Sequence, residues 1–120
     1  MVMIKLTMVV PVYGVENYIN KFLDSLEKNL QQGIEVIIID DGTKDNSGKI
    51  ADEFASKHPE YITVIHKENG GHGSAVNAGL EHATGLFFKV VDSDDWVDEE
   101  ALQKILEQIH KFEENDVEVD

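Results

Sequence analysis

Four short apolar runs alternate with four segments of helical periodicity, and this alternation constrains the fold more than any other feature. The runs are rich in β-branched residues and predict buried strands at residues 4–12, 35–39, 61–66 and 86–91. In the other segments apolar residues recur three or four positions apart, which predicts amphipathic helices. The helical segments contain Tyr18, Ile19, Phe22, Leu23, Leu26 and Leu30, then Ile50, Ala51, Phe54 and Ala55, then residues 74–83, and finally Ala101, Leu102, Ile105, Leu106, Ile109 and Phe112.

This order predicts an α/β fold, with a Rossmann-like, open, mainly parallel sheet and helices on both of its faces. Each strand is expected to be buried on both sides, because the runs are continuously apolar and do not alternate with polar residues. A length of 120 residues suits one domain with its own core.

Three carboxylates within four residues follow the last apolar run, in Asp92-Ser93-Asp94-Asp95. Because like charges repel, a folded chain keeps such a group together mainly for a cation or a hydrogen-bonding ligand. A hard divalent ion with oxygen ligands, Mg²⁺ or Mn²⁺, meets that need. An acidic turn in which Asp98 caps the next helix explains the same residues equally well. The cluster alone leaves both interpretations open.

Polar residues follow the other three expected strands as well. They are Pro11-Val12-Tyr13, Asp40-Asp41-Gly42-Thr43 and His66-Lys67-Glu68-Asn69-Gly70-Gly71-His72-Gly73. The carboxyl ends of parallel strands lie along one edge of a sheet, where open α/β folds bind their ligands. The four groups are therefore expected to build one site.

A site of this composition suits a nucleotide that carries a diphosphate. Asp41 can accept a hydrogen bond from a base imide or a ribose hydroxyl, whereas Asp40 is expected to be structural. Gly70, Gly71 and Gly73 would let backbone N–H groups approach a phosphate at a helix N-terminus. The same glycines fit a tight strand-to-helix connection equally well, and the aspartate pair also fits a simple turn.

Composition excludes several other classes. The absence of cysteine rules out a disulfide scaffold, a thiolate metal site and a cysteine nucleophile. A net charge of −14 disfavours nucleic acids and anionic membranes as partners. No G-x-G-x-x-G follows the first strand, and the P-loop element is missing. No apolar stretch is long enough to span a bilayer and the first residues lack signal-peptide features, so we expect a cytoplasmic protein.

Taken together, the motifs resemble the N-terminal, donor-binding half of inverting family 2 glycosyltransferases of the GT-A fold. The matching elements are Val9-Val10-Pro11-Val12-Tyr13, Ile39-Asp40-Asp41-Gly42-Thr43-Lys44-Asp45, Asn69-Gly70-Gly71 with Asn77-Ala78-Gly79, and Val91-Asp92-Ser93-Asp94-Asp95. They run in order through nearly all of residues 4–112. The resemblance implies transfer of a sugar from a nucleoside diphosphate sugar, most often a UDP-sugar, to an acceptor hydroxyl with inversion.

The resemblance also implies site residues. In that family the Asp-x-Asp element binds a metal ion and the nucleotide sugar, so Asp94 would be the main ligand of Mg²⁺ or Mn²⁺. Asp92 would contact the metal or the ribose, and Asp41 would read the base. The remaining nucleotide-binding residues implied are Pro11, Val12, Tyr13, Asn69, Gly70 and Gly71.

The family's catalytic base and acceptor site come from sequence beyond the acidic cluster, so the base is expected beyond residue 120. Residues 1–113 would then form a nucleotide-sugar-binding domain, truncated before that half, and residues 114–120 an acidic tail. Such a fragment alone is expected to be inactive. The acceptor would be a glycan or a lipid-linked molecule, and the longer enzyme would act in the cytoplasm, at the inner face of the membrane.

One departure from the family pattern lies at Val76, where the family often has an arginine that helps to hold the nucleotide. A neighbouring residue, His72 or Lys67, would have to take its place. The other histidines show no zinc-site spacing and are expected to have no role in the site. They are His58, His66, His82 and His110.

Two further functions remain open at this point. The chain can be a nucleotide-binding module without turnover, or a metal-dependent phosphotransfer domain of the receiver type. A receiver's acidic pair follows the first strand, whereas Asp40-Asp41 follows the second. A haloacid-dehalogenase-like motif needs threonine or valine at the position that Trp96 occupies.

Overall fold

The computed structural model describes residues 4, 6–92 and 103–109. In chain order the elements are β1 (Leu6–Val12), α1 (Ile19–Glu27), β2 (Ile34–Asp40), α2 (Ser47–Lys57), β3 (Ile62–His66), α3 (His72–His82) and β4 (Phe87–Val90). Residues 103–109 are also helical. The predicted alternation of strands and helices is therefore confirmed over the described part of the chain.

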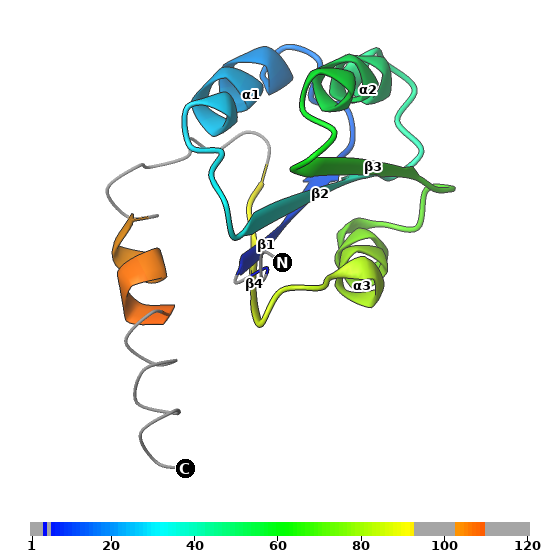
Figure 1. The fold of residues 1–120 in the computed structure, drawn as a ribbon. Helices are drawn as coiled ribbons and strands as arrows, with labels where there is room; N and C mark the ends of the chain where they lie inside the picture. Colours follow the sequence, from blue (N-terminus) through cyan, green and yellow to red (C-terminus); the bar gives the residue numbers. More distant parts are fainter. Residues whose placement is uncertain (1–3, 5, 93–102, 110–120) are drawn as a thin grey trace.

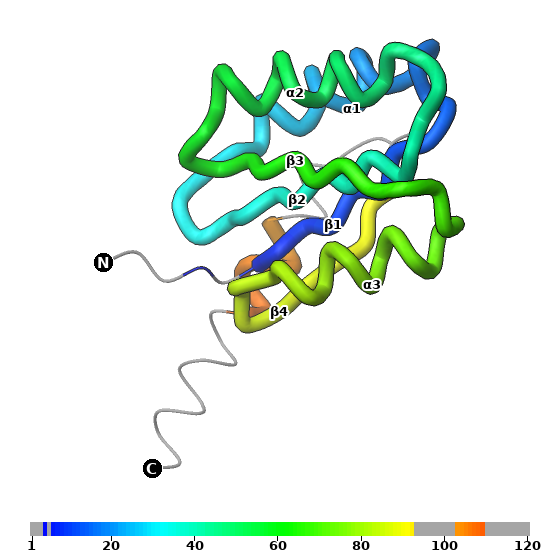
Figure 2. Tube along the Cα trace, turned by 90° about the vertical axis from the view of Figure 1, so that its right-hand side faces the viewer, coloured from blue at the N-terminus to red at the C-terminus, as the bar shows by residue number. Residues whose placement is uncertain are grey.

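The strands form one parallel sheet in the order β3-β2-β1-β4. Helices α1 and α2 cover one face and α3 covers the other (Figure 1). A view turned by 90° shows the sheet between these two helical layers (Figure 2). The predicted Rossmann-like α/β fold is confirmed, and the carboxyl ends of all four strands lie at one edge of the sheet.

The core lies on both sides of the two central strands. Met8 and Val10 of β1 and Ile38 of β2 pack with α1 and α2. The intervening residues Val9 and Ile37 pack on the other face with α3. This alternation follows from the two-residue period of a strand. Burial on both faces, as predicted from the continuous apolar runs, is observed for β1 and β2.

The prediction that every strand is buried on both sides is wrong for β3 and β4. They lie at the two ends of the described sheet, so each has a neighbouring described strand on one side only. Thr63 of β3 is exposed, and Phe88 of β4 keeps 59% of its surface exposed. The apolar character of a run did not reveal its position in the sheet.

The apolar period also predicts Tyr18 on the buried face of the first helix, and this is wrong. Helix α1 begins at Ile19, and Tyr18 occupies the cap position before it, with 58% of its surface exposed. Phe22 and Leu26 are buried as predicted. Leu30 lies beyond the helix end but packs against the same core.

Several sequence predictions lie outside the described residues. They concern Asp94, Trp96, Asp98, the two ends of the last helix and residues 114–120. Within the described ranges, none of the helices combines the length and the apolar character needed to cross a bilayer.

Candidate functional site

A pocket of about 460 Å³ opens where the carboxyl ends of the strands meet the start of α3. Its lining residues are Pro11, Val12, Tyr13, Val15, Asp41, Asn69, Gly71, His72, Ala75 and Asp92. Of the nucleotide-binding residues that the family resemblance implies, all but Gly70 line the pocket, and Gly70 contacts Asp41 through its backbone. His72, one of the two residues considered in place of the family's arginine, also lines it, whereas Lys67 and Gly73 do not. Val15 and Ala75 are lining residues that were not predicted.

The carboxylate of Asp41 organises the loop after β3, although its side chain is only 5% exposed. Its Oδ1 accepts hydrogen bonds from Lys67 Nζ at 2.9 Å and from the Gly70 N–H at 3.0 Å. Its Oδ2 accepts from the Gly71 N–H at 3.0 Å, and Asn69 Nδ2 donates to the Asp41 carbonyl at 3.0 Å. One buried anion therefore fixes the wall of the pocket that carries the glycines.

The charge of this carboxylate is maintained by its partners. Burial alone would raise the pKa of Asp41, but the hydrogen bonds from Lys67, Gly70 and Gly71 outweigh it, so the pKa lies below its usual range. Because an ionised carboxylate accepts hydrogen bonds only, the surrounding donors and the charge stabilise each other.

Two glycines of the pocket loops are required by the backbone. Gly71 precedes α3 with a φ of +92°, and Gly42 follows Asp41 with a φ of +71°. A Cβ at Gly42 would also lie 2.6 Å from the backbone nitrogen of Asn69. Side chains other than hydrogen are disfavoured at such φ values. The glycines therefore let the loops after β2 and β3 approach each other beside the pocket.

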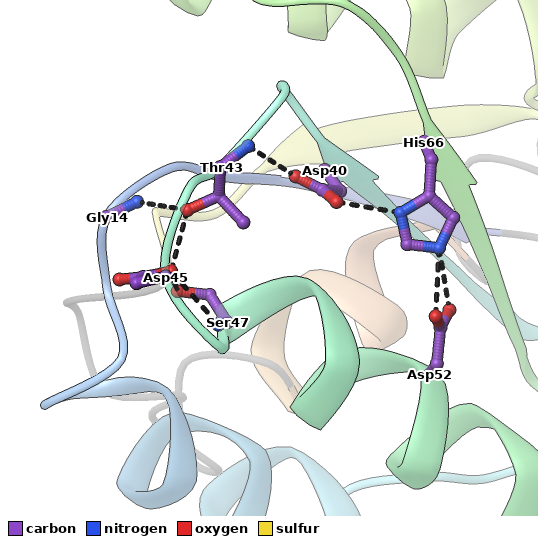
Figure 3. A network of polar contacts seen from close by, with 7 residues as sticks. All are labelled: Gly14, Asp40, Thr43, Asp45, Ser47, Asp52 and His66. Atoms are coloured by element: carbon purple, nitrogen blue, oxygen red, sulfur yellow. Dashed lines mark hydrogen bonds and ion pairs between the residues drawn. The ribbon is translucent and has the colours of Figure 1, made fainter.

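The loop after β1 is tied to the turn before α2 (Figure 3). The Thr43 hydroxyl accepts from the Gly14 N–H at 2.9 Å and donates to Asp45 Oδ1 at 2.7 Å. The Ser47 hydroxyl accepts from the Val15 N–H at 3.1 Å and also donates to Asp45. These bonds fix the loop that brings Tyr13 and Val15 to the pocket.

Asp45 is the centre of this second network. Asn46 is the cap residue of α2, but its side chain makes no capping hydrogen bond. Asp45 Oδ1 accepts from the Ser47 N–H at 3.0 Å instead. Burial would raise the pKa of Asp45, but hydrogen bonds donated by Ser47, Thr43 and the Glu16 backbone hold the pKa at about 2.

This low pKa leads to a prediction for acid stability. Since the folded pKa of Asp45 is below its usual value of 3.8, its contribution is complete above pH 3.8 and is lost as pH falls toward about 2. We expect Asp45→Asn to lower the free energy of unfolding by about 1–2 kcal/mol at neutral pH, after allowance for solvent screening.

Urea unfolding at a series of pH values measures this effect. The difference between wild type and Asp45→Asn should shrink as the pH is lowered through this window. Asp24→Asn, which alters an exposed carboxylate of α1, is the matched control and should change stability little. A difference for Asp45→Asn that stays constant down to the acid limit contradicts the assignment.

Asp92 lines the pocket and follows β4. Its side chain is 53% exposed, and its Oδ1 lies 3.2 Å from Nε2 of His72. An exposed carboxylate of this kind can serve as an oxygen ligand for a hard divalent ion. No group of three metal-ligating side chains occurs among the described residues, and Asp94 lies outside them. The described chain thus supplies one carboxylate of the predicted pair.

The two residues considered as substitutes for the family's arginine differ in their surroundings. Lys67 Nζ donates to Asp41 and, at 2.7 Å, to the Glu68 carbonyl, so its charge is used within the loop. His72 lines the pocket with its side chain 64% exposed. Of the two, only His72 presents its side chain to the pocket.

Asp40 and His66 lie outside the pocket. Asp40 lies on the same face of β2 as Ile38. Its carboxylate contacts the His66 ring and accepts a hydrogen bond from the Thr43 N–H. The expectation that Asp40 is structural agrees with these contacts. The expectation for His66, drawn only from zinc spacing, missed its contacts with Asp40 and Asp52. The one feature of the sequence that could have indicated a role for His66 is its position at the end of a strand, directly before Lys67.

A parallel α/β domain with a glycine-rich loop and carboxylates at the carboxyl edge of its strands has the arrangement of a nucleotide-binding domain. More specifically, the chain belongs to glycosyl transferase family 2, whose family model matches residues 7–119. The fold likewise matches solved GT-A structures.

Among its relatives, glycosyltransferase GlyA of Streptococcus pneumoniae is 38% identical over 109 residues, which are 91% of this chain and 16% of GlyA. The crystal structure of S. aureus TarS residues 1–349 with UDP-GlcNAc superposes with a TM-score of 0.79 at 32% identity, covering 89% of this chain and 31% of TarS. The structure of mannosyltransferase PcManGT from Pyrobaculum calidifontis, with GDP-Man and Mn²⁺, gives a TM-score of 0.74 at 27% identity. The match covers 82% of this chain and 30% of PcManGT. The chain thus spans at most about a third of these proteins.

Proposed function

We propose that this chain is the donor-binding part of a metal-dependent glycosyltransferase that transfers a sugar from a nucleoside diphosphate sugar to an acceptor hydroxyl with inversion. The observation that carries the proposal is the single pocket shared by Tyr13, Asp41, Gly71 and Asp92, which come from the ends of different strands. Family membership and the structural likeness to TarS support it.

The donor is proposed to be a UDP-sugar, because TarS, at 32% identity, was crystallised with UDP-GlcNAc. The exposed ring of Tyr13, with 51% of its surface accessible, offers a stacking surface for a base. Asp41 holds the loop against which the nucleotide would lie. Its Oδ2 accepts from the Gly71 N–H at 3.0 Å and from Asn69 Nδ2 only at 3.4 Å, so an imide N–H of the base would take the place of the long Asn69 contact.

The metal is proposed to be Mg²⁺ or Mn²⁺, as Mn²⁺ accompanies GDP-Man in PcManGT. Asp92 would hold it together with Asp94, and the bound ion would neutralise the diphosphate leaving group as a Lewis acid. His72, beside Asp92, would orient that carboxylate or donate a hydrogen bond to a phosphate oxygen. The catalytic base is expected in sequence beyond residue 120.

A receiver-like phosphotransfer function is less compatible with the geometry. A phosphoacceptor pocket needs neighbouring carboxylates that face one cation. Asp40 and Asp41 point to opposite faces of the sheet, the first toward His66 and the second toward Lys67. A nucleotide-binding module without turnover uses the same pocket and differs only in activity.

Calorimetric titration of the chain with UDP and UDP-glucose, with and without Mn²⁺, tests the proposal. We expect binding that requires the metal, with GDP and dTDP as weaker competitors. Equal affinity with and without Mn²⁺ would contradict the metal role. An absence of binding for every nucleotide, or phosphorylation of the chain by acetyl phosphate, would contradict the donor-binding function.

A further inference from the structure

The imidazole ring of His66 lies between two carboxylates that come from different elements (Figure 3). Its Nδ1 is 2.7 Å from Oδ2 of Asp40, at the end of β2. Its Nε2 is 2.8 and 3.0 Å from the two carboxylate oxygens of Asp52, on α2. The ring therefore connects the last residue of β2 to α2 through the last residue of β3.

The two contacts together favour a charged ring. A neutral imidazole has one N–H and one lone pair, so it can donate to only one carboxylate. The other ring nitrogen would then face an anion at hydrogen-bond distance with its own lone pair. The imidazolium ion donates from both nitrogens and satisfies Asp40 and Asp52 at once. Consistent with this, hydrogen bonds to Asp40 and Asp52 raise the pKa of His66 above its usual value of 6.5, although burial opposes the shift.

The backbone connects the His66 contacts to the pocket. Asp40 and His66 are paired in the parallel register of β2 and β3, and the Lys67 N–H donates to the Asp40 carbonyl at 2.9 Å. The residue after β2 is Asp41, which lines the pocket, and the residue after β3 is Lys67, which forms an ion pair with Asp41 at 2.9 Å. Asp41 in turn holds Gly70.

Asp40 is also connected, through Thr43, to the loop after β1 on the other side of the pocket. Its Oδ1 accepts a hydrogen bond from the Thr43 N–H at 2.9 Å, and the Thr43 hydroxyl accepts from the Gly14 N–H. Gly14 follows Tyr13, which lines the pocket. The orientation of the Asp40 carboxylate therefore affects the loops on both sides of the site.

We propose that His66 is a positioning residue for the pocket: as an imidazolium ion held between Asp40 and Asp52, it fixes the ends of β2 and β3, which are followed by Asp41 of the pocket and by its ion-pair partner Lys67. It touches no ligand itself, because it lies on the opposite face of the sheet. Loss of its proton releases one of the two carboxylates and loosens the glycine loop.

The direction of the pH dependence follows from the charges at the ring. The acidic groups that contact it are Asp40 from β2 and Asp52 from α2. The adjacent Lys67 directs its ammonium group to Asp41. Since the folded pKa is raised, the contribution of His66 is complete below pH 6.5 and is lost as pH rises through the folded value.

Nuclear magnetic resonance of the ligand-free chain tests the proposal directly. The His66 ring is titrated from about pH 5 to pH 9, while the amide resonances of Asp41, Lys67 and Gly70 are followed. We expect these amides to shift with the midpoint of the His66 ring. In His66→Gln the shift that follows the His66 midpoint should disappear, although His72 is present beside the pocket in both proteins. His58→Gln, which removes a histidine paired with Glu27 at 3.0 Å, should keep it.

The outcome that overturns the proposal is a set of pocket amides that do not follow the His66 ring, or that shift in the same way in His66→Gln. Asp52→Asn provides a second variant, because it removes one carboxylate without touching the sheet. It should lower the midpoint of the ring and of the pocket amides together. Independent midpoints contradict the coupling.

A second readout uses UDP with Mn²⁺ and rests on the proposed function. Affinity of the wild type should weaken by about three- to tenfold between about pH 6.5 and pH 8.5, because a smaller fraction of the chain has the ordered loop. His66→Gln should show little of this change, and it corrects for titration of the nucleotide. If UDP does not bind at any pH, the proposed function fails while the resonance test still decides the role of His66.

Discussion

Asp41→Asn is expected to abolish measurable UDP binding and to lower the free energy of unfolding by about 2–4 kcal/mol. The substituted amide has one acceptor oxygen in place of two and presents an NH₂ group to a donor. It cannot accept from Lys67, Gly70 and Gly71 together, as the carboxylate does. Urea unfolding and calorimetry measure the two effects separately.

Asp41→Asn with Lys67→Met is the control for charge. Removal of the carboxylate alone leaves the Lys67 ammonium, which is 22% exposed, without its anion. Removal of both charges avoids that cost, so the double variant should be more stable than Asp41→Asn alone. Its UDP binding should nevertheless remain lost, because Gly70 and Gly71 have lost their acceptor. Undiminished UDP affinity in Asp41→Asn would show that this carboxylate does not organise the site.

Asp92→Asn is expected to have the opposite pattern, with metal-dependent binding lost and stability kept. The side chain of Asp92 is 53% exposed, so its substitution should change the free energy of unfolding by no more than about 0.5 kcal/mol. Because an amide is a weaker ligand for a hard cation than a carboxylate, we expect Mn²⁺-dependent UDP affinity to fall by about tenfold or more.

Asp94→Ala extends this test to the residue implied as the main metal ligand, and it should abolish the metal-dependent part of binding. Glu81→Gln, an exposed carboxylate of α3, controls for the loss of one negative charge and should bind as the wild type does. If Asp92→Asn and Asp94→Ala both keep the full response to Mn²⁺, the acidic cluster is a turn and the metal role is wrong.

The class of fold could be predicted because hydrophobic periodicity reports burial, and burial follows secondary structure. The continuous apolar run of residues 35–39 identified a strand covered on both faces, and this holds for β2. The same signal failed at Phe88, since sheet order depends on contacts distant in sequence. It failed at Tyr18 because the residue lies one position before the helix begins.

The position of the pocket could also be predicted, because parallel strands bring their carboxyl ends to one edge. The separate functions of Asp40 and Asp41 were harder to assign. Adjacent strand residues point to opposite faces, so one carboxylate lies in the pocket and the other contacts His66. The two-residue period of a strand predicts that alternation, but it does not show which residues contact the carboxylate on each face. The place of His66 between Asp40 and Asp52 depends on the packing of α2.

Amide chemical shifts recorded with UDP in the presence of Mg²⁺ locate the nucleotide on the chain. We expect the largest changes at Tyr13, Gly70, Gly71 and His72, around the pocket at the carboxyl edge of the sheet. Small or no changes should occur beside the apolar groove formed by Leu6, Phe88 and Gln108. Changes centred on that groove, or none at the glycine loop at saturating nucleotide, would contradict the account.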